Sequence, residues 1–96
     1  MSFYLTALLK CKAGEAAKVK PLLLDLVAAS VKEEACLQYE LYQDREDENQ
    51  FIFHETWKDV AGWEQHNQQA HYKKFGQEVG PLLEGAPTLH KTHRIG

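Results

Sequence analysis

Two hydrophobic periods alternate along this chain, and their order restricts the folds that it can adopt. Strand-like segments, with alternating or continuous apolar residues, alternate with segments in which apolar residues recur at helical spacing. The predicted strands are Phe3–Lys12, Leu37–Gln43, Phe51–Trp57 and Thr88–Ile95, and the predicted helices cover 19–31 and 60–79. The resulting order, strand, helix, strand, strand, helix, strand, predicts a ferredoxin-like α+β fold: a four-stranded antiparallel sheet with helices on one face.

Local signals refine these elements. Pro21 would cost about 3 kcal/mol inside a helix, so we expect a kink there or a helix that starts close to it. Asp59 is a candidate N-cap for the second helical segment, and Gly62 is a weak point within it. We also expect a break near Gln69-Ala70. The wholly polar residues 44–50 predict a solvated hairpin loop, to which we assign no function.

Bulk properties exclude several classes of protein. With 96 residues and a net charge of -3, the chain is expected to form one domain over 1–96 without the basic field that nucleic acid or anionic lipid requires. No apolar run is long enough to span a bilayer, and the N-terminus lacks the features of a signal peptide. Cys11 and Cys36 are therefore expected to be reduced thiols, and the cytoplasm is the expected location.

The sheet face without helices predicts an assembly. Depending on register, this face carries Tyr4, Leu8, Tyr42 or Ile52, which is more apolar surface than water normally covers. Two such sheets packed face to face would close a barrel with the helices outside. We therefore expect a homodimer, a dimeric α+β barrel.

The third predicted strand carries the first candidate catalytic group. Phe51, Phe53, Glu55 and Trp57 share one face of this strand, so Glu55 lies in an aromatic row. Desolvation there would raise the pKa of Glu55 and make it a candidate base near neutral pH. The alternative is a structural carboxylate that bonds a helix end or pairs with a lysine across the dimer.

The following helix carries the other candidates. Val60, Trp63, Asn67 and His71 fall on one stripe at helical spacing, and His66 lies about 100° away from the centre of that stripe. This predicts that the Asn67 amide faces the sheet, where it either organises a local network or contacts a ligand. Imidazoles exchange protons near neutral pH, so His66 and His71 are candidate catalytic residues, with ordinary packing as the alternative.

The aromatic residues of this region are expected to form the wall of a pocket. Trp57 and Trp63 are assigned to the core or to a pocket wall, and Tyr72 is a further substrate-binding candidate. No metal or cofactor is expected. His66 and His71 are five residues apart rather than three or four, and no glycine-rich phosphate loop, nucleophile elbow or Cys-x-x-Cys is present.

Five stretches together resemble the antibiotic biosynthesis monooxygenase (ABM) family, which includes quinol monooxygenases. They cover nearly the whole chain: Ala13-Gly14-Glu15, the segment from Ala35 to Leu41, Glu55-Thr56-Trp57, the segment from Trp63 to His66, and the segment from His71 to Phe75. Two positions depart from the family pattern, since Ala35 stands where the family usually has Gly and Ala70 stands where Pro often precedes the histidine.

The resemblance implies a cavity between sheet and helices in which a small phenolic or quinol substrate is oxidised with O2, without metal or flavin. The protein would deprotonate the substrate, and the resulting anion would itself reduce oxygen. Carried over by position, the pocket candidates are Glu55, Trp57, His66, Asn67 and His71. Catalysis is thus assigned to His66, His71 and Glu55, and substrate binding to Asn67, Trp57, Trp63 and Tyr72.

Two other functions stay open at this point. One is an isomerase that transfers a proton next to a carbonyl of a phosphorylated, sugar-like ligand, and the other is a dimeric binding protein without catalysis. The pocket segment offers Lys73 and Lys74 as the only cations for a phosphate. Haem degradation, known in one branch of the family, is disfavoured because the first strand has no Asn and no His lies between His71 and His90. The sequence does not identify the substrate.

Overall fold

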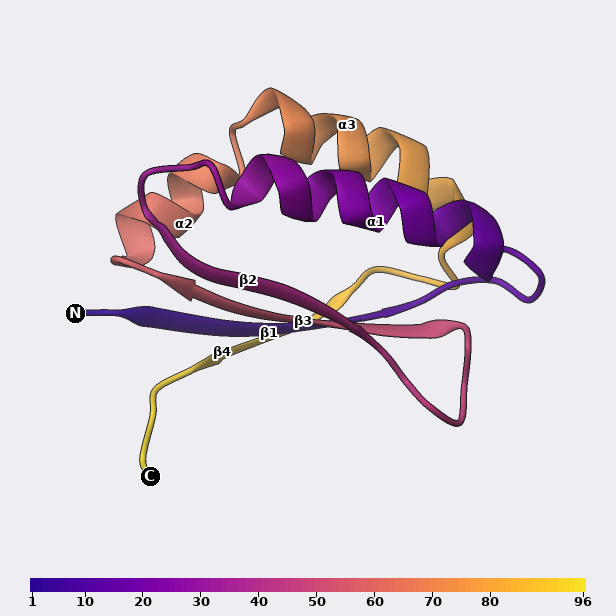
Figure 1. Ribbon diagram of the computed structural model, residues 1–96, viewed down its shortest axis with the longest axis horizontal. Coiled ribbons are helices and arrows are strands. Elements are labelled where there is room, and N and C mark those ends of the chain that lie inside the picture. The colour runs from indigo at the N-terminus through magenta and orange to yellow at the C-terminus, as the bar shows by residue number, and fades with distance from the viewer.

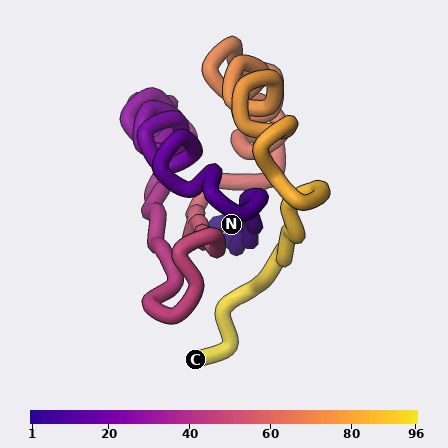
Figure 2. Tube along the Cα trace, turned by 90° about the vertical axis from the view of Figure 1, so that its right-hand side faces the viewer, coloured from indigo at the N-terminus to yellow at the C-terminus, as the bar shows by residue number.

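The computed structural model covers residues 1–96 and confirms the ferredoxin-like α+β fold. Its four strands form one antiparallel sheet in the order β2-β3-β1-β4. Helices α1, α2 and α3 lie together on one face of the sheet (Figure 1), and the end view shows that the opposite face carries no helix (Figure 2). The elements are β1 (Phe3–Lys10), α1 (Ala16–Ser30), β2 (Cys36–Gln43), β3 (Gln50–Trp57), α2 (Val60–His66), α3 (Ala70–Val79), the 3-10 turn η1 (Gly80–Leu82) and β4 (Thr88–Thr92).

Strand alternation builds the core as predicted. Alternate residues of the two central strands point toward the helices and are buried, whereas their neighbours point to the helix-free face. On β3 the inward row contains Phe51, Phe53, Glu55 and Trp57, which was the predicted set. Each large apolar side chain in this row contributes roughly 1.5–3 kcal/mol by leaving water, so the row fixes the register of the strand.

The first and last strands in the sequence are shorter than predicted. β1 ends at Lys10 rather than Lys12, because Cys11 leaves the ladder and forms an isolated bridge with Leu83. β4 ends at Thr92 rather than Ile95. Thr92 pairs with Tyr4, and β1 begins only one residue before Tyr4, so the last residues of the chain have no further strand to pair with.

The first helix tolerates its proline. α1 begins at Ala16 and continues through Pro21, so the proline lies inside the helix rather than at its start. Pro21 offers no N–H to the carbonyl of Ala17, which leaves that acceptor without its usual helical partner. Val19, Leu23 and Leu26 are buried against the sheet and hold the helix in place.

The second helical segment breaks in two, as predicted near Gln69-Ala70, and α2 begins with the predicted cap. Asp59 has extended backbone angles, and its Oδ1 accepts a hydrogen bond from the backbone N–H of Gly62 at 2.8 Å. The rotation of α2 about its axis differs from the prediction. A Cβ on Gly62 would lie 2.5 Å from the Cβ of Ala35, so α2 packs through its glycine face. Gly62 and His66 therefore point inward, and Val60 is exposed.

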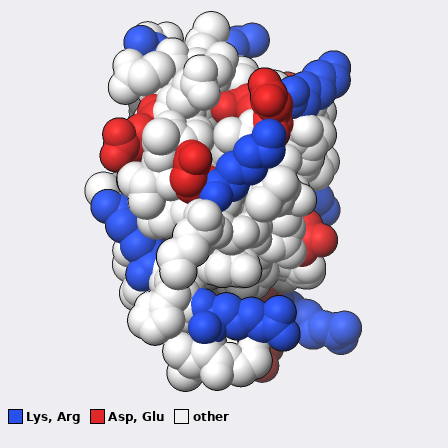
Figure 3. All heavy atoms as spheres, turned by 90° about the vertical axis from the view of Figure 1, so that its left-hand side faces the viewer, with Lys and Arg blue, Asp and Glu red and all other residues white.

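Surface features agree with the bulk composition. No helix is both long enough and apolar enough to cross a bilayer. Basic and acidic side chains are interspersed over the end of the molecule seen in Figure 3, without a large region of one sign. The two cysteines are free thiols, with Cys11 buried and Cys36 partly buried.

Candidate active site

A small apolar cavity lies between the sheet and the helices. Its volume is about 30 Å³, and ten of its thirteen lining residues are hydrophobic. This volume holds about two water molecules, so a ring-sized ligand requires the surrounding side chains to move apart. Four of the seven predicted site residues line the cavity, namely Glu55, Trp63, His66 and Tyr72. The other three, Trp57, Asn67 and His71, do not line it.

Glu55 is the only carboxyl group of the cavity wall. It is 6% exposed, and its Oε1 accepts a hydrogen bond from Trp57 Nε1 at 3.0 Å. Burial raises the pKa of Glu55 to about 7, although the Trp57 N–H opposes this rise, and the charge of Glu33 adds to it. Glu55 therefore changes its charge near neutral pH, which is where a general base is most effective.

The two tryptophans have different positions. Trp57 is fully buried behind Glu55, so it contributes a hydrogen-bond donor rather than a wall of the cavity. Trp63 is the tryptophan on the cavity wall. Its ring lies 5.3 Å from the ring of Phe3, and Lys91 Nζ lies 4.9 Å from its centre, within the range of a cation–π contact.

His66 is the last residue of α2 and is 1% exposed. Its ring lies 4.6 Å from that of Trp57 and 4.8 Å from that of Tyr72. Its Nδ1 is 2.6 Å from Glu33 Oε2. Burial lowers the pKa of His66, and the Glu33 carboxylate opposes this effect. The prediction that His66 lies to the side of the inward face is wrong, because the Gly62 contact rotates α2.

His71 approaches the same carboxylate from α3. Its Nε2 is 2.7 Å from Glu33 Oε2, and its side chain is 26% exposed in a surface hollow outside the cavity. Asn67 is the C-cap residue of α2 and is partly buried. Its Oδ1 is nevertheless buried without a hydrogen-bond partner.

Sequence reasoning missed two residues of this region. One is Glu33, which no local pattern in the sequence distinguishes from its neighbour Glu34. Tyr39 lines the cavity from β2 and is 5% exposed, and burial raises the pKa of its hydroxyl. The alternation of β2 offered a signal for Tyr39, because residues two apart on a strand share a face and Leu41 is packed against the core.

Glu33, His66 and His71 are also the one group of side chains with the composition of a metal site, since their ligand atoms lie within 4.8 Å of one another. His66 and His71 are five residues apart in the sequence, but the break between α2 and α3 brings their rings to the same carboxylate. Tetrahedral zinc with bonds of about 2.0–2.2 Å keeps its ligand atoms about 3.3 Å apart, so these side chains would have to separate to hold such an ion. As they lie, the separations of 2.6 and 2.7 Å are those of charge-assisted hydrogen bonds.

The fold and the cavity define a small α+β protein that encloses an apolar pocket containing paired acid–base groups. The family model described as antibiotic biosynthesis monooxygenase matches residues 2–78. The chain therefore belongs to the antibiotic biosynthesis monooxygenase family, which confirms the resemblance seen in the sequence.

Individual relatives agree with this assignment. The chain is 36% identical over 67 residues to the candidate monooxygenase YcnE of Bacillus subtilis (strain 168), a match that covers 70% of each protein. The crystal structure of PA3566 from Pseudomonas aeruginosa is 33% identical and superposes with a TM-score of 0.93, covering 99% of this chain and 95% of that one. Rv0793 from Mycobacterium tuberculosis shares the fold, with a TM-score of 0.92 at 17% identity and coverage of 100% and 97%. Family and relatives thus support a monooxygenase-type oxidoreductase.

Proposed function

We propose that the protein is a cofactor-independent monooxygenase that deprotonates a small phenolic or quinol substrate and lets the resulting anion react with O2. The observation that carries the proposal is the composition of the cavity. Its wall is mainly hydrophobic and aromatic, and its ionisable side chains include Glu55 and His66, which can accept a proton from a substrate hydroxyl. Such a wall suits a flat and uncharged ring with one or two hydroxyl groups.

The reaction balances without an external reductant. Loss of the O–H proton to a base in the cavity leaves an electron-rich phenolate, which transfers an electron to O2. The substrate radical and superoxide then combine at a ring carbon to form a peroxide. Cleavage of the O–O bond leaves one oxygen atom on the ring as a carbonyl, and the other departs as water with the two hydrogens from the substrate O–H and C–H bonds. All four electrons that O2 takes up come from the substrate.

The isomerase alternative receives less support from this cavity. A phosphorylated ligand needs a cation or a helix N-terminus for its phosphate. No lysine or arginine lines the cavity, and Lys74 lies on an outer hollow between α1 and α3. An uncharged substrate is therefore the better match.

The proposal is tested by oxygen uptake with a panel of quinols, phenols and anthrone-type substrates. One O2 should be consumed per substrate, with water rather than hydrogen peroxide as the second product. Replacing the true base should lower turnover by roughly 10²–10⁴-fold. The variants are Glu55→Gln, His66→Ala and His71→Ala, with His93→Ala as a matched control because His93 is an exposed histidine after the end of β4.

Two outcomes would refute the proposal. If all three variants retain the wild-type rate on a substrate that the wild type oxidises, the site is in the wrong place. If the wild type consumes no oxygen with any member of the panel, isomerase or binding activity becomes the better description. We also expect the purified protein to be colourless and free of stoichiometric metal, flavin and haem.

We further propose that the protein acts as a homodimer joined through the helix-free face of the sheet. Support comes from the register, in which Leu8 pairs with Ile52 and Ile52 pairs with Tyr42. These three side chains form an apolar row across β1, β3 and β2, and Tyr42 remains 49% exposed in the single chain. Burying such a row against a second copy would remove apolar area from water.

A further inference from the structure

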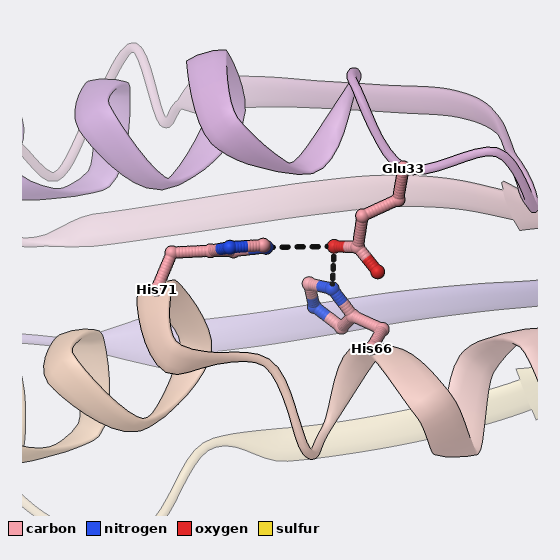
Figure 4. A group of neighbouring side chains, drawn as sticks. All are labelled: Glu33, His66 and His71. Carbon is pink, nitrogen blue, oxygen red and sulfur yellow. Dashed lines mark hydrogen bonds and ion pairs between the residues drawn. The ribbon is translucent and has the colours of Figure 1, made fainter.

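Three segments that are distant in sequence place side chains on one carboxylate oxygen. Glu33 lies in the turn after α1, His66 ends α2 and His71 lies in the first turn of α3. Glu33 Oε2 is 2.6 Å from His66 Nδ1 and 2.7 Å from His71 Nε2, and Figure 4 shows the two rings approaching this oxygen from different sides. The carboxylate is thus the centre of the cluster.

The chemistry of the three groups indicates where the hydrogens are. An ionised carboxylate only accepts hydrogen bonds, so each of the two nitrogens that face an ionised Glu33 carries a hydrogen. One carboxylate oxygen has lone pairs for two donors, so an ionised Glu33 that accepts from both histidines satisfies both short contacts.

The remaining nitrogen of His66 follows from this arrangement. Burial favours the neutral imidazole, which has only one N–H. Because that hydrogen lies on Nδ1, Nε2 carries a lone pair. Nε2 is buried and has no hydrogen-bond partner. His66 lines the cavity, whereas Glu33 and His71 do not. Nε2 is therefore the nitrogen of His66 that is free to bind a ligand there.

We propose that Glu33 is a positioning residue that holds His66 in the Nδ1–H tautomer, so that His66 Nε2 is the base that accepts the proton of a substrate hydroxyl in the cavity. His71 assists as the second donor to the same carboxylate oxygen. This assignment rests on the proposed function only for the identity of the substrate. The tautomer itself is a property of the free protein.

The cluster suits a base that must later act as an acid. When the substrate O–H bond breaks, an N–H bond forms at His66 Nε2, and the imidazolium lies directly against the Glu33 carboxylate. The same proton is then delivered to the distal oxygen of the substrate peroxide as the O–O bond breaks, and loss of the ring C–H proton, which forms the carbonyl, supplies the second hydrogen of the departing water. His66 returns to its neutral form, and O2 is the only oxidant required.

Glu55 is then the second ionisable group of the cavity rather than the base. Because Trp57 Nε1 donates to Glu55 Oε1, the carboxyl group is held in place at the cavity wall. A protonated Glu55 can donate a hydrogen bond to a developing oxyanion or peroxide. The two groups thus divide the roles of acceptor and donor.

The test measures the tautomer directly, by nitrogen-15 NMR of histidine-labelled protein at neutral pH without substrate. In the wild type, His66 should show a protonated Nδ1 and an unprotonated Nε2. In Glu33→Gln the preference for Nδ1–H should be lost, because an amide can donate to Nδ1 as well as accept from it. The matched control is Glu34→Gln, which removes the neighbouring exposed carboxylate and should leave His66 unchanged.

A second variant keeps the test decisive if Glu33→Gln does not fold. His71→Gln leaves Glu33 available to His66, so His66 should keep its Nδ1–H tautomer even though the second donor has changed. A wild-type His66 that is protonated at Nε2, or a spectrum that Glu33→Gln does not alter, overturns the proposal.

Activity separates this proposal from the function on which it rests. On an oxidised quinol, Glu33→Gln should lower kcat by roughly 10-fold or more with little change in KM, and Glu33→Asp should recover part of the loss. Absence of any oxidation together with the expected tautomer refutes the monooxygenase function and leaves the positioning role intact. Oxidation by a protein with the other tautomer refutes the positioning role alone.

Discussion

Replacing Glu55 by Gln should stabilise the protein, and the gain should grow as the pH rises. Burial raises the pKa of Glu55 from 4.5 to about 7, so the folded protein retains a proton that the unfolded chain releases between these values. Folding stability therefore falls as pH rises through this window, and the full penalty applies above pH 7. At about 1.4 kcal/mol per pKa unit, the difference of about 2.5 corresponds to about 3 kcal/mol.

Glutamine removes the charge and retains the shape and the acceptor for Trp57 Nε1. We expect similar stabilities of wild type and Glu55→Gln below pH 4.5, and an advantage of about 3 kcal/mol for the variant at pH 8. Urea denaturation at one fixed protein concentration measures the difference. With m-values of about 1–3 kcal/mol/M, the midpoint should move by roughly 1–3 M.

Glu64→Gln is the matched control, because Glu64 is an exposed carboxylate on α2 and its replacement removes one charge from the surface. The other ionisable groups are the same in wild type and variant, so their contributions largely cancel in the comparison. A difference between wild type and Glu55→Gln that does not change with pH would show that Glu55 is not desolvated. A larger stability of the wild type at pH 8 would reverse the sign and refute the reasoning.

Four further predictions follow from the structure. Gly62→Ala should destabilise the fold by roughly 1–3 kcal/mol in urea denaturation, because the new Cβ would lie 2.5 Å from the Cβ of Ala35. Gly76→Ala is the control and should not destabilise the fold, because no atom lies within 4 Å of a Cβ at that position. Asp59→Ala should cost about 1 kcal/mol of stability through loss of the α2 cap, measured in the same way. Cys36 should react slowly with a thiol reagent at pH 8, since burial raises its pKa to about 11; reaction as fast as a free thiol would contradict this. Light scattering at micromolar concentration should give the mass of a dimer, and a mass near 11 kDa would contradict the proposed interface.

Much of the fold could be predicted because its signals are local. The alternation of Phe51, Phe53, Glu55 and Trp57 depends only on the two-residue period of a strand, and the structure buries all four. The Asp59 cap and the break near Gln69-Ala70 are likewise properties of short segments. The desolvation of Glu55 followed from its position in an aromatic row, so its raised pKa was also accessible to sequence reasoning.

The site depended on contacts between distant segments. The rotation of α2 is set by the contact between Gly62 and Ala35, which helical periodicity cannot reveal, and this rotation turns His66 inward. Glu33 could not be distinguished from Glu34 in the sequence. Its carboxylate meets His66 and His71 only because the turn after α1 packs against the break between α2 and α3. The sequence by itself thus determined the order of elements, the buried rows and the chemical groups available, because these depend on local periodicity and composition. The tertiary structure alone decided which of those groups share a proton, because a hydrogen bond depends on distances between segments that the chain leaves far apart.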